Sequence, residues 1–177
     1  TITLGVSGDT INVPSGVTIA NSGTATGFAA NTPAFFAYLG GSGGQSVSNN
    51  TITKVTINAE VFDTDNAFDS SSNYRFTPQT AGKYFIAFTI YALTANAGNG
   101  NLLALTANIR KNGSNQTQVV QDYNNNFIRQ GCATTTAVID MNGSTDYIDF
   151  TSDVAAGSGD GRFENHTRAN GFLLIGA

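Results

Sequence analysis

Apolar and polar side chains alternate along most of this chain with the period of two that is typical of β-strands. The clearest segment is GKYFIAFTIYAL, residues 82–93. One face of this predicted strand carries Tyr84, Ile86, Phe88 and Ile90. The other face carries Phe85, Ala87, Tyr91 and Leu93. Because both faces are apolar and aromatic, we expect a central strand whose sheet is covered on both sides.

Other segments follow the same pattern. TKVTINAEVF, residues 53–62, places Val55, Ile57, Ala59 and Val61 on one face, which predicts a single half-buried strand. AFFAYLG is apolar and aromatic, and the closing GFLLIGA is continuously apolar. An apolar edge strand would promote aggregation, so we expect the closing segment in the middle of a sheet.

Two Asn-Gly pairs, Asn112-Gly113 and Asn142-Gly143, stand between alternating segments. Asn-Gly in that setting is the strongest local signal for a β-hairpin, so two hairpins are predicted. No segment has a convincing amphipathic helical period. The sequence therefore predicts an all-β, antiparallel jelly-roll sandwich of about eight to ten strands.

The first 32 residues have a different texture. Ser-Gly recurs at residues 7–8, 15–16 and 22–23, and pairs of apolar residues lie between these repeats. This pattern predicts very short strands that pack on a body or on partner chains, because they are too short to bury a face alone. A flexible Gly/Ser linker is the alternative. We therefore divide the chain into a β-repeat stem, residues 1–32, and a head, residues 33–177.

Charge excludes several partners. Only 11% of the residues are charged, against roughly 25% in an average soluble domain, and the net charge is −4. A chain without basic excess offers no surface for nucleic acid. No apolar run approaches the ~20 residues of a membrane helix, so no membrane insertion is expected. Cys132 is the only cysteine, which precludes an intrachain disulfide, and its neighbours predict a small, buried strand residue.

The chain shows no clustered acid, base and nucleophile, so we expect no enzyme, no catalytic residue and no cofactor. His166 is the only histidine, and no nucleophile motif surrounds Cys132 to suggest a Cys132–His166 pair. We expect His166 in a solvated loop or at the entry to the last strand.

The loop DTDNAFD offers oxygen ligands for Ca²⁺ from Asp63, Asp65, Asn66 and Asp69. It is not an EF-hand, since Phe68 stands at its sixth position and Tyr74 at its twelfth. We expect a turn-capping loop without a metal site.

Eight positions together resemble the globular head of complement C1q and its tumour-necrosis-factor-like relatives. They are Ile57, Asp63, Phe68, Phe76, Gly82, Tyr84, Ile86 and Phe88. The sequence departs from the family pattern at Ile57 and Ile86, where Phe is usual, and by one extra residue between Phe68 and Phe76. The resemblance spans roughly residues 33–177.

This resemblance implies a homotrimer with aromatic inner sheets packed around a threefold axis. One face of residues 82–93 and 171–175 would fill the sandwich, and the other would contact partner chains. The candidate residues of these trimer and core strands are Tyr84, Phe85, Ile86, Phe88, Tyr91, Phe172, Leu173, Leu174 and Ile175.

The stem resembles those of bacteriophage tail and head fibres. That likeness implies an extracellular virion appendage, bound to other virion proteins through the stem, whose head binds a host-surface glycan or protein. Two alternatives stay open at this point: a structural protein that decorates the capsid or forms a joint, and a secreted C1q-like binding module.

Overall fold

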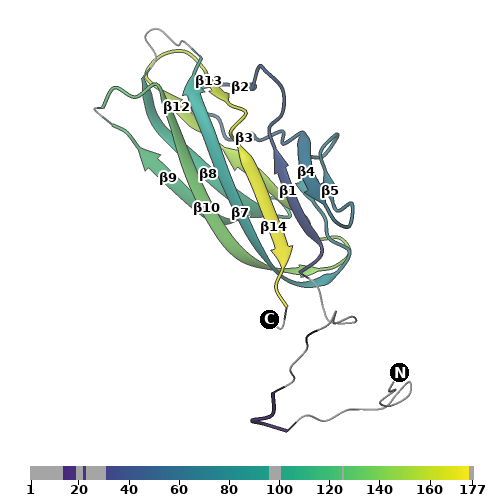
Figure 1. The fold of residues 1–177 in the computed structure, drawn as a ribbon. Helices are drawn as coiled ribbons and strands as arrows, with labels where there is room; N and C mark the ends of the chain where they lie inside the picture. The colour runs from purple at the N-terminus through teal and green to yellow at the C-terminus, as the bar shows by residue number, and fades with distance from the viewer. Residues whose placement is uncertain (1–13, 19–21, 23–30, 96–100, 125, 176–177) are drawn as a thin grey trace.

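A computed structural model describes residues 14–18, 22, 31–95, 101–124 and 126–175, and Figure 1 shows its fold. These residues form fourteen strands and no helix. Most of the predicted stem, residues 1–32, lies outside the described part of the chain. Among the described residues, no helix is long and apolar enough to span a membrane.

Two seven-stranded sheets pack face to face, and every strand pairing is antiparallel. Sheet A has the order β2 (Gln45–Val47), β13 (Gly161–Phe163), β7 (Ala81–Thr94), β14 (Arg168–Leu173), β1 (Ala34–Tyr38) and β4 (Ala59–Asp63), and β10 (Gln130–Asn142) also pairs with β7. Sheet B has the order β12 (Val154–Ala156), β8 (Leu102–Lys111), β11 (Ile148–Ser152), β6 (Arg75–Phe76) and β5 (Phe68–Asp69). Its remaining strands are β3 (Thr53–Lys54), which pairs with β11, and β9 (Ser114–Asp122), which pairs with β8.

The central strand β7 confirms the prediction made from residues 82–93. Tyr84, Ile86 and Phe88 are fully buried between the sheets, and the residues between them are half-buried. The apolar closing segment also lies in mid-sheet, because β14 runs between β7 and β1. Its Gly171 fits tightly there: a Cβ atom would come within 2.5 Å of the Ile86 side chain and 2.9 Å of the Phe35 ring.

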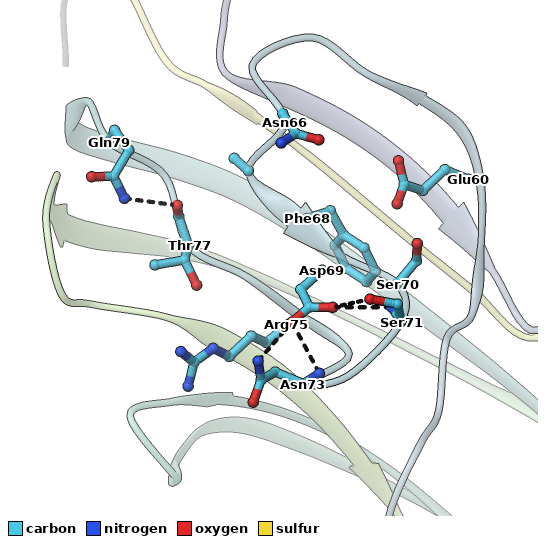
Figure 2. A pocket seen from close by; sticks show the side chains of 11 residues that line it. Glu60, Asn66, Phe68, Asp69, Ser70, Ser71, Asn73, Arg75, Thr77 and Gln79 are labelled. Atoms are coloured by element: carbon cyan, nitrogen blue, oxygen red, sulfur yellow. Dashed lines mark hydrogen bonds between the residues drawn. The ribbon is translucent and has the colours of Figure 1, made fainter.

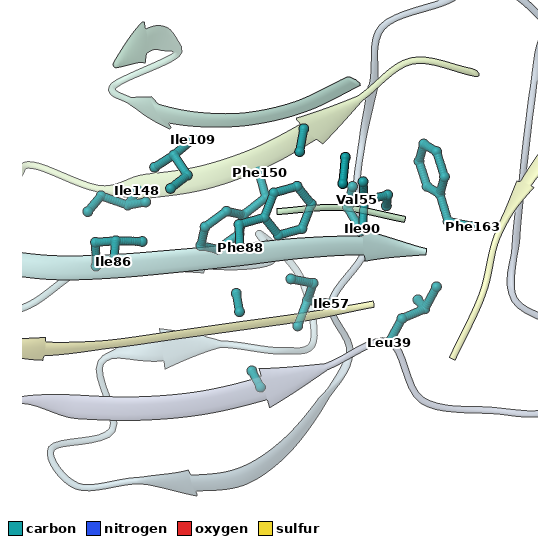
Figure 3. Close-up of a cluster of buried hydrophobic side chains, with 14 of the residues drawn as sticks. Leu39, Val55, Ile57, Ile86, Phe88, Ile90, Ile109, Ile148, Phe150 and Phe163 are labelled. Carbon is teal, nitrogen blue, oxygen red and sulfur yellow. The ribbon is translucent and has the colours of Figure 1, made fainter. Parts of the chain in front are cut away.

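The core between the sheets combines aliphatic side chains with stacked aromatic rings (Figure 3). Phe88 of sheet A stacks on Phe150 of sheet B with ring centroids 4.9 Å apart, and Phe35 stacks on Phe76 at 4.5 Å. Each such ring pair adds about 0.5–1.5 kcal/mol to the stabilisation from burial alone. The motif positions Ile57, Phe68, Phe76, Tyr84, Ile86 and Phe88 all belong to this core.

The two Asn-Gly pairs differ. Asn112-Gly113 closes the predicted hairpin between β8 and β9, with positive φ at both residues. The hairpin prediction at Asn142-Gly143 is wrong, because β10 pairs with β7 in sheet A whereas β11 pairs in sheet B. The chain turns at this point, with Asn142 Oδ1 accepting the N–H groups of Ser144, Thr145 and Asp146, but it crosses between the sheets.

The prediction of one strand over residues 53–62 is also wrong. Val55 and Ile57 are fully buried, but β3 ends at Lys54 in sheet B and β4 begins at Ala59 in sheet A. The register of β4 against β1 shifts between Phe36 and Ala37, so β4 holds one extra residue, and Val61 is exposed. A bulge of this kind changes which side chains face the core.

Strand register defines two ends of the sandwich. At the near end, Ala34 of β1 pairs with Phe172 of β14, and Ala81 of β7 pairs with Asn142 of β10. At the far end, Thr94 of β7 pairs with Gly161 of β13. β1 begins and β14 ends at the near end (Figure 1).

Candidate interaction surfaces

The outward side of sheet A carries apolar side chains on several neighbouring strands, with Thr89, Thr134, Thr136, Arg168 and Asn170 between some of them. We define the apolar face as Phe36, Tyr38, Phe62, Phe85, Tyr91, Val138 and Phe172. Register places Val138, Phe85 and Phe172 in one row across β10, β7 and β14. The Phe85 and Phe172 rings lie 5.5 Å apart, and the Phe36 and Phe62 rings 6.5 Å apart.

Large parts of the apolar face are accessible to solvent in the single chain. Val138 is 57% exposed, Phe62 is 49% exposed and Tyr38 is 37% exposed. Isolated exposed apolar residues are normal on a protein surface, but a contiguous aromatic patch marks an interaction site. The apolar face therefore has the properties of a surface that a partner covers.

The structure divides the predicted trimer and core residues between two surfaces. Tyr84, Ile86 and Phe88 lie inside the sandwich, whereas Phe85, Tyr91 and Phe172 lie on the apolar face. Leu173 packs against the core, Leu174 is half-buried beyond the end of β14, and Ile175 is 52% exposed. Sequence alone could not make this division for the closing segment, because its apolar run has no alternation.

Cys132 is exposed, so the prediction that it is buried is wrong. It lies on β10 opposite Tyr91, and strand alternation turns both side chains outward. His166, in the loop before β14, meets the Tyr91 ring edge-on at 5.3 Å. Tyr91 therefore lies between Cys132 and His166, and no hydrogen bond joins these two side chains in the described structure.

The outward side of sheet B contrasts with the apolar face. We define the polar face as Lys54, Asn108, Arg110, Asp149 and Thr151. Arg110 donates two hydrogen bonds to Asp149, at 2.9 and 2.7 Å, and Lys54 forms an ion pair with the same carboxylate at 3.3 Å. Asn108 donates to Thr151 at 3.2 Å. Side chains on this face are therefore held mainly by one another.

The acidic loop after β4 caps turns, as its sequence indicated. Asp63 accepts a hydrogen bond from the Phe68 N–H at 2.7 Å. Asp69 accepts five hydrogen bonds, from the backbone or side chains of Ser71, Ser72 and Asn73. These donors, above all the Ser72 N–H and the Asn73 amide, hold the pKa of Asp69 far below its usual range. No group of three or more metal-ligating side chains occurs within the described residues.

A depression of about 480 Å³ adjoins this loop on the flank of the sandwich (Figure 2). We call it the side depression. Its lining is Glu60, Asn66, Ala67, Phe68, Asp69, Ser70, Ser71, Asn73, Arg75, Thr77 and Gln79. Sequence reasoning singled out Asn66 and Asp69 as potential calcium ligands but missed Glu60 and Arg75, which come from β4 and β6. Only the bulge in β4 brings Glu60 to the core side of the sheet edge, in register with Ala37.

No protein-family profile and no curated protein matches this sequence. The fold, however, is similar to the globular domain of zebrafish complement 1qA protein, with a TM-score of 0.58 and 17% identity over 81% of this chain and 98% of that domain. Murine APRIL at pH 5.0 gives a TM-score of 0.57 with 10% identity, covering 80% of this chain and 98% of that one. Eiger TNF from S. frugiperda gives 0.54 with 12% identity, covering 81% and 93%.

The head has the C1q/TNF-type jelly-roll fold. Sequence identities of 17% or less establish only that the folds are similar. They do not indicate that this chain binds the same ligands. The resemblance of residues 1–32 to bacteriophage fibre stems stays a prediction.

Proposed function

We propose that this chain forms a homotrimer whose apolar faces pack against one another, and that the trimer is a binding module on a virion. Its head would bind a host-surface ligand, and its stem would bind other virion proteins. The observation that carries the proposal is the outward row of Phe172, Phe85 and Val138 across sheet A, with the Phe36–Phe62 ring pair on the neighbouring strands. Val138 and Phe62 are about half exposed in the single chain.

Symmetric packing is the simplest way to cover such a face. A cyclic homotrimer repeats one pair of surfaces in each of its three interfaces, so the same residues are covered in every copy. The C1q/TNF-type fold supports this arrangement. Low charge supports it too, since 11% charged residues leave few groups that would oppose close packing of sheets.

Assembly into a trimer supports a binding role. Three identical sites on one trimer raise the overall avidity, so a weak single-site affinity is sufficient for attachment. Catalysis is not part of the proposal, because Cys132 and His166 are separated by Tyr91 instead of forming a nucleophile–base pair. The virion assignment rests on the fibre-like stem sequence of residues 1–32.

Two measurements test the proposal with the full chain. Sedimentation velocity measures the mass in solution, and we expect a trimer; a monomer over the micromolar range would overturn the assembly. Competition for host cells between purified trimer and phage measures attachment, and we expect the trimer to reduce infection. If a well-folded trimer neither binds cells nor competes, host attachment is overturned, and a capsid-decorating or joint protein becomes the favoured function.

A further inference from the structure

Neither the packing of the core nor the proposed assembly accounts for the side depression. We propose that it binds a sugar residue of a neutral glycan. This inference rests on the proposed function, because it names the class of ligand that the head would take from a host surface. It places recognition on the flank of the sandwich, beside β4 and β5 (Figure 2).

Several polar groups of the side depression have no partner within the protein. The carboxylate of Glu60, the amide of Asn66 and the hydroxyl of Ser70 make no hydrogen bond to any described residue. By contrast, the neighbouring carboxylate of Asp69 accepts five. Donors and acceptors that are free and gathered in one hollow suit a ligand that carries many hydrogen-bonding groups.

The walls of the side depression are preorganised. Asp69 fixes the turn from Ser71 to Asn73 through its hydrogen bonds. Arg75 is held with its guanidinium carbon 4.4 Å from the centroid of the Tyr147 ring. Phe68, which is 4% exposed, anchors the floor by stacking on Phe35 at 5.0 Å. A rigid site loses little conformational entropy when it binds, which favours affinity from few contacts.

Size and charge then select the ligand class. A volume of about 480 Å³ lies within the roughly 300–1,000 Å³ typical of small-molecule sites. The lining is mostly polar, which disfavours an apolar ligand. The site has one positive charge, on Arg75, and two negative charges, on Glu60 and Asp69. This balance disfavours a phosphate or another anion. The oxygens of Asp69 are occupied by N–H and O–H donors, which disfavours a cation. Hydroxyls, which both donate and accept, fit this mixture.

Saturation-transfer-difference NMR on the full chain tests the site, with free glucose, galactose, mannose and N-acetylglucosamine as probes. We expect at least one sugar to give a signal. Ser70→Trp fills the hollow and should abolish that signal, while Ser114→Trp places the same side chain on the exposed β8–β9 hairpin and should preserve it. Glu60→Gln keeps the shape but removes the charge, and should weaken binding about tenfold, as the loss of a charged hydrogen bond does.

Each contrary result overturns the inference: no signal from any of the four sugars, a signal that survives Ser70→Trp, or a signal that Ser114→Trp also removes. Melting temperature and sedimentation of each variant verify that it folds and assembles as the wild type does. Cell binding separates the two proposals. If wild type and Ser70→Trp bind host cells equally, the glycan site fails and host attachment stands. If the sugar signal depends on Ser70 but the wild type binds no cells, the site stands and host attachment fails.

Discussion

The two outward faces of this sandwich are built on the same kind of strand but differ in what satisfies their side chains. On the polar face, Asp149 is 3% exposed and is paired with Arg110 and Lys54. On the apolar face, Val138 is 57% exposed and makes a row with Phe85 and Phe172. The charged groups of the polar face are paired within a single chain, although the buried Asn108 Oδ1 accepts no hydrogen bond from any described residue. The exposed side chains of the apolar face would gain stability from a partner.

This difference shows that inward burial alone does not reveal how a sandwich assembles. Both sheets bury an apolar inner face, so the inner faces look alike in the sequence and in the structure. The outward residues of each strand indicate whether a partner covers the sheet, because an outward face that contacts only water rarely carries several neighbouring aromatic rings. The predictions below test this contrast, in order of decreasing effect.

The largest effect is expected from a charge on the apolar face. Val138→Asp would place an unpaired carboxylate in a desolvated interface, which costs several kcal/mol and should convert the trimer to a monomer. Val120→Asp is the matched control, because Val120 on β9 is 54% exposed, nearly the same as Val138. Sedimentation equilibrium of both variants checks the prediction. Equal behaviour of the two variants would contradict a covered apolar face.

The next effect tests whether the polar face is complete without a partner. Asp149→Ala leaves Arg110 and Lys54 without their carboxylate, and because both cations are partly exposed we expect a loss of about 2 kcal/mol rather than the full value for a buried pair. Asp140→Ala on β10 is the control, since Asp140 is exposed and should change stability by less than about 0.5 kcal/mol. Urea unfolding measures both. Similar losses in both variants would show that the polar face is not specially stabilised.

Acid should weaken the hydrogen-bonded carboxylates while leaving the apolar face unaffected. Hydrogen bonds from Lys111 and Asn112 lower the pKa of Asp146 to about 2, and the pKa of Asp69 is lowered in the same direction. A folded-state pKa below the unfolded value of about 3.9 gives stability that is present above about pH 4 and is lost as the pH falls towards 2. Melting temperatures between pH 7 and pH 2 measure this loss, and Asp69→Asn with Asp146→Asn should flatten it. An unchanged slope in the double variant would refute the assignment.

The smallest effect concerns Cys132, which reports coverage without strongly affecting stability. Its thiol is exposed in the single chain beside Tyr91, so it should react slowly with a maleimide in the trimer and at least about tenfold faster in monomeric Val138→Asp. Cys132→Ser should change stability by less than about 0.5 kcal/mol. Rapid labelling of the intact trimer would place Cys132 outside the covered surface.

Local sequence patterns predicted those features that depend on neighbours along the chain. The period of two in residues 82–93 identified β7 and divided its two faces, because alternation is a direct consequence of the pleat. Asn112-Gly113 predicted a hairpin because the residues at a tight turn need positive φ, which both have here. Tertiary context enters little into either feature.

Features that depend on the choice of partner strand were missed. Asn142-Gly143 signals a turn equally well whether the next strand pairs with the last one or crosses to the other sheet. The alternation of residues 53–62 similarly conceals a change of sheet and a bulge near Val61. The side depression was missed for the same reason, since Glu60 reaches it only through that bulge and Arg75 comes from another strand.

The near end of the sandwich has a practical consequence for engineering. Ala34 and Phe172 are paired neighbours there, and the Leu173 N–H donates to the Pro33 carbonyl at 3.1 Å. Because the first and last strands start and finish side by side, residues 33–175 have the geometry of a cassette that could be spliced into a surface loop of an unrelated carrier protein. A cargo attached at either terminus would emerge on one side, which leaves the opposite end unobstructed for display.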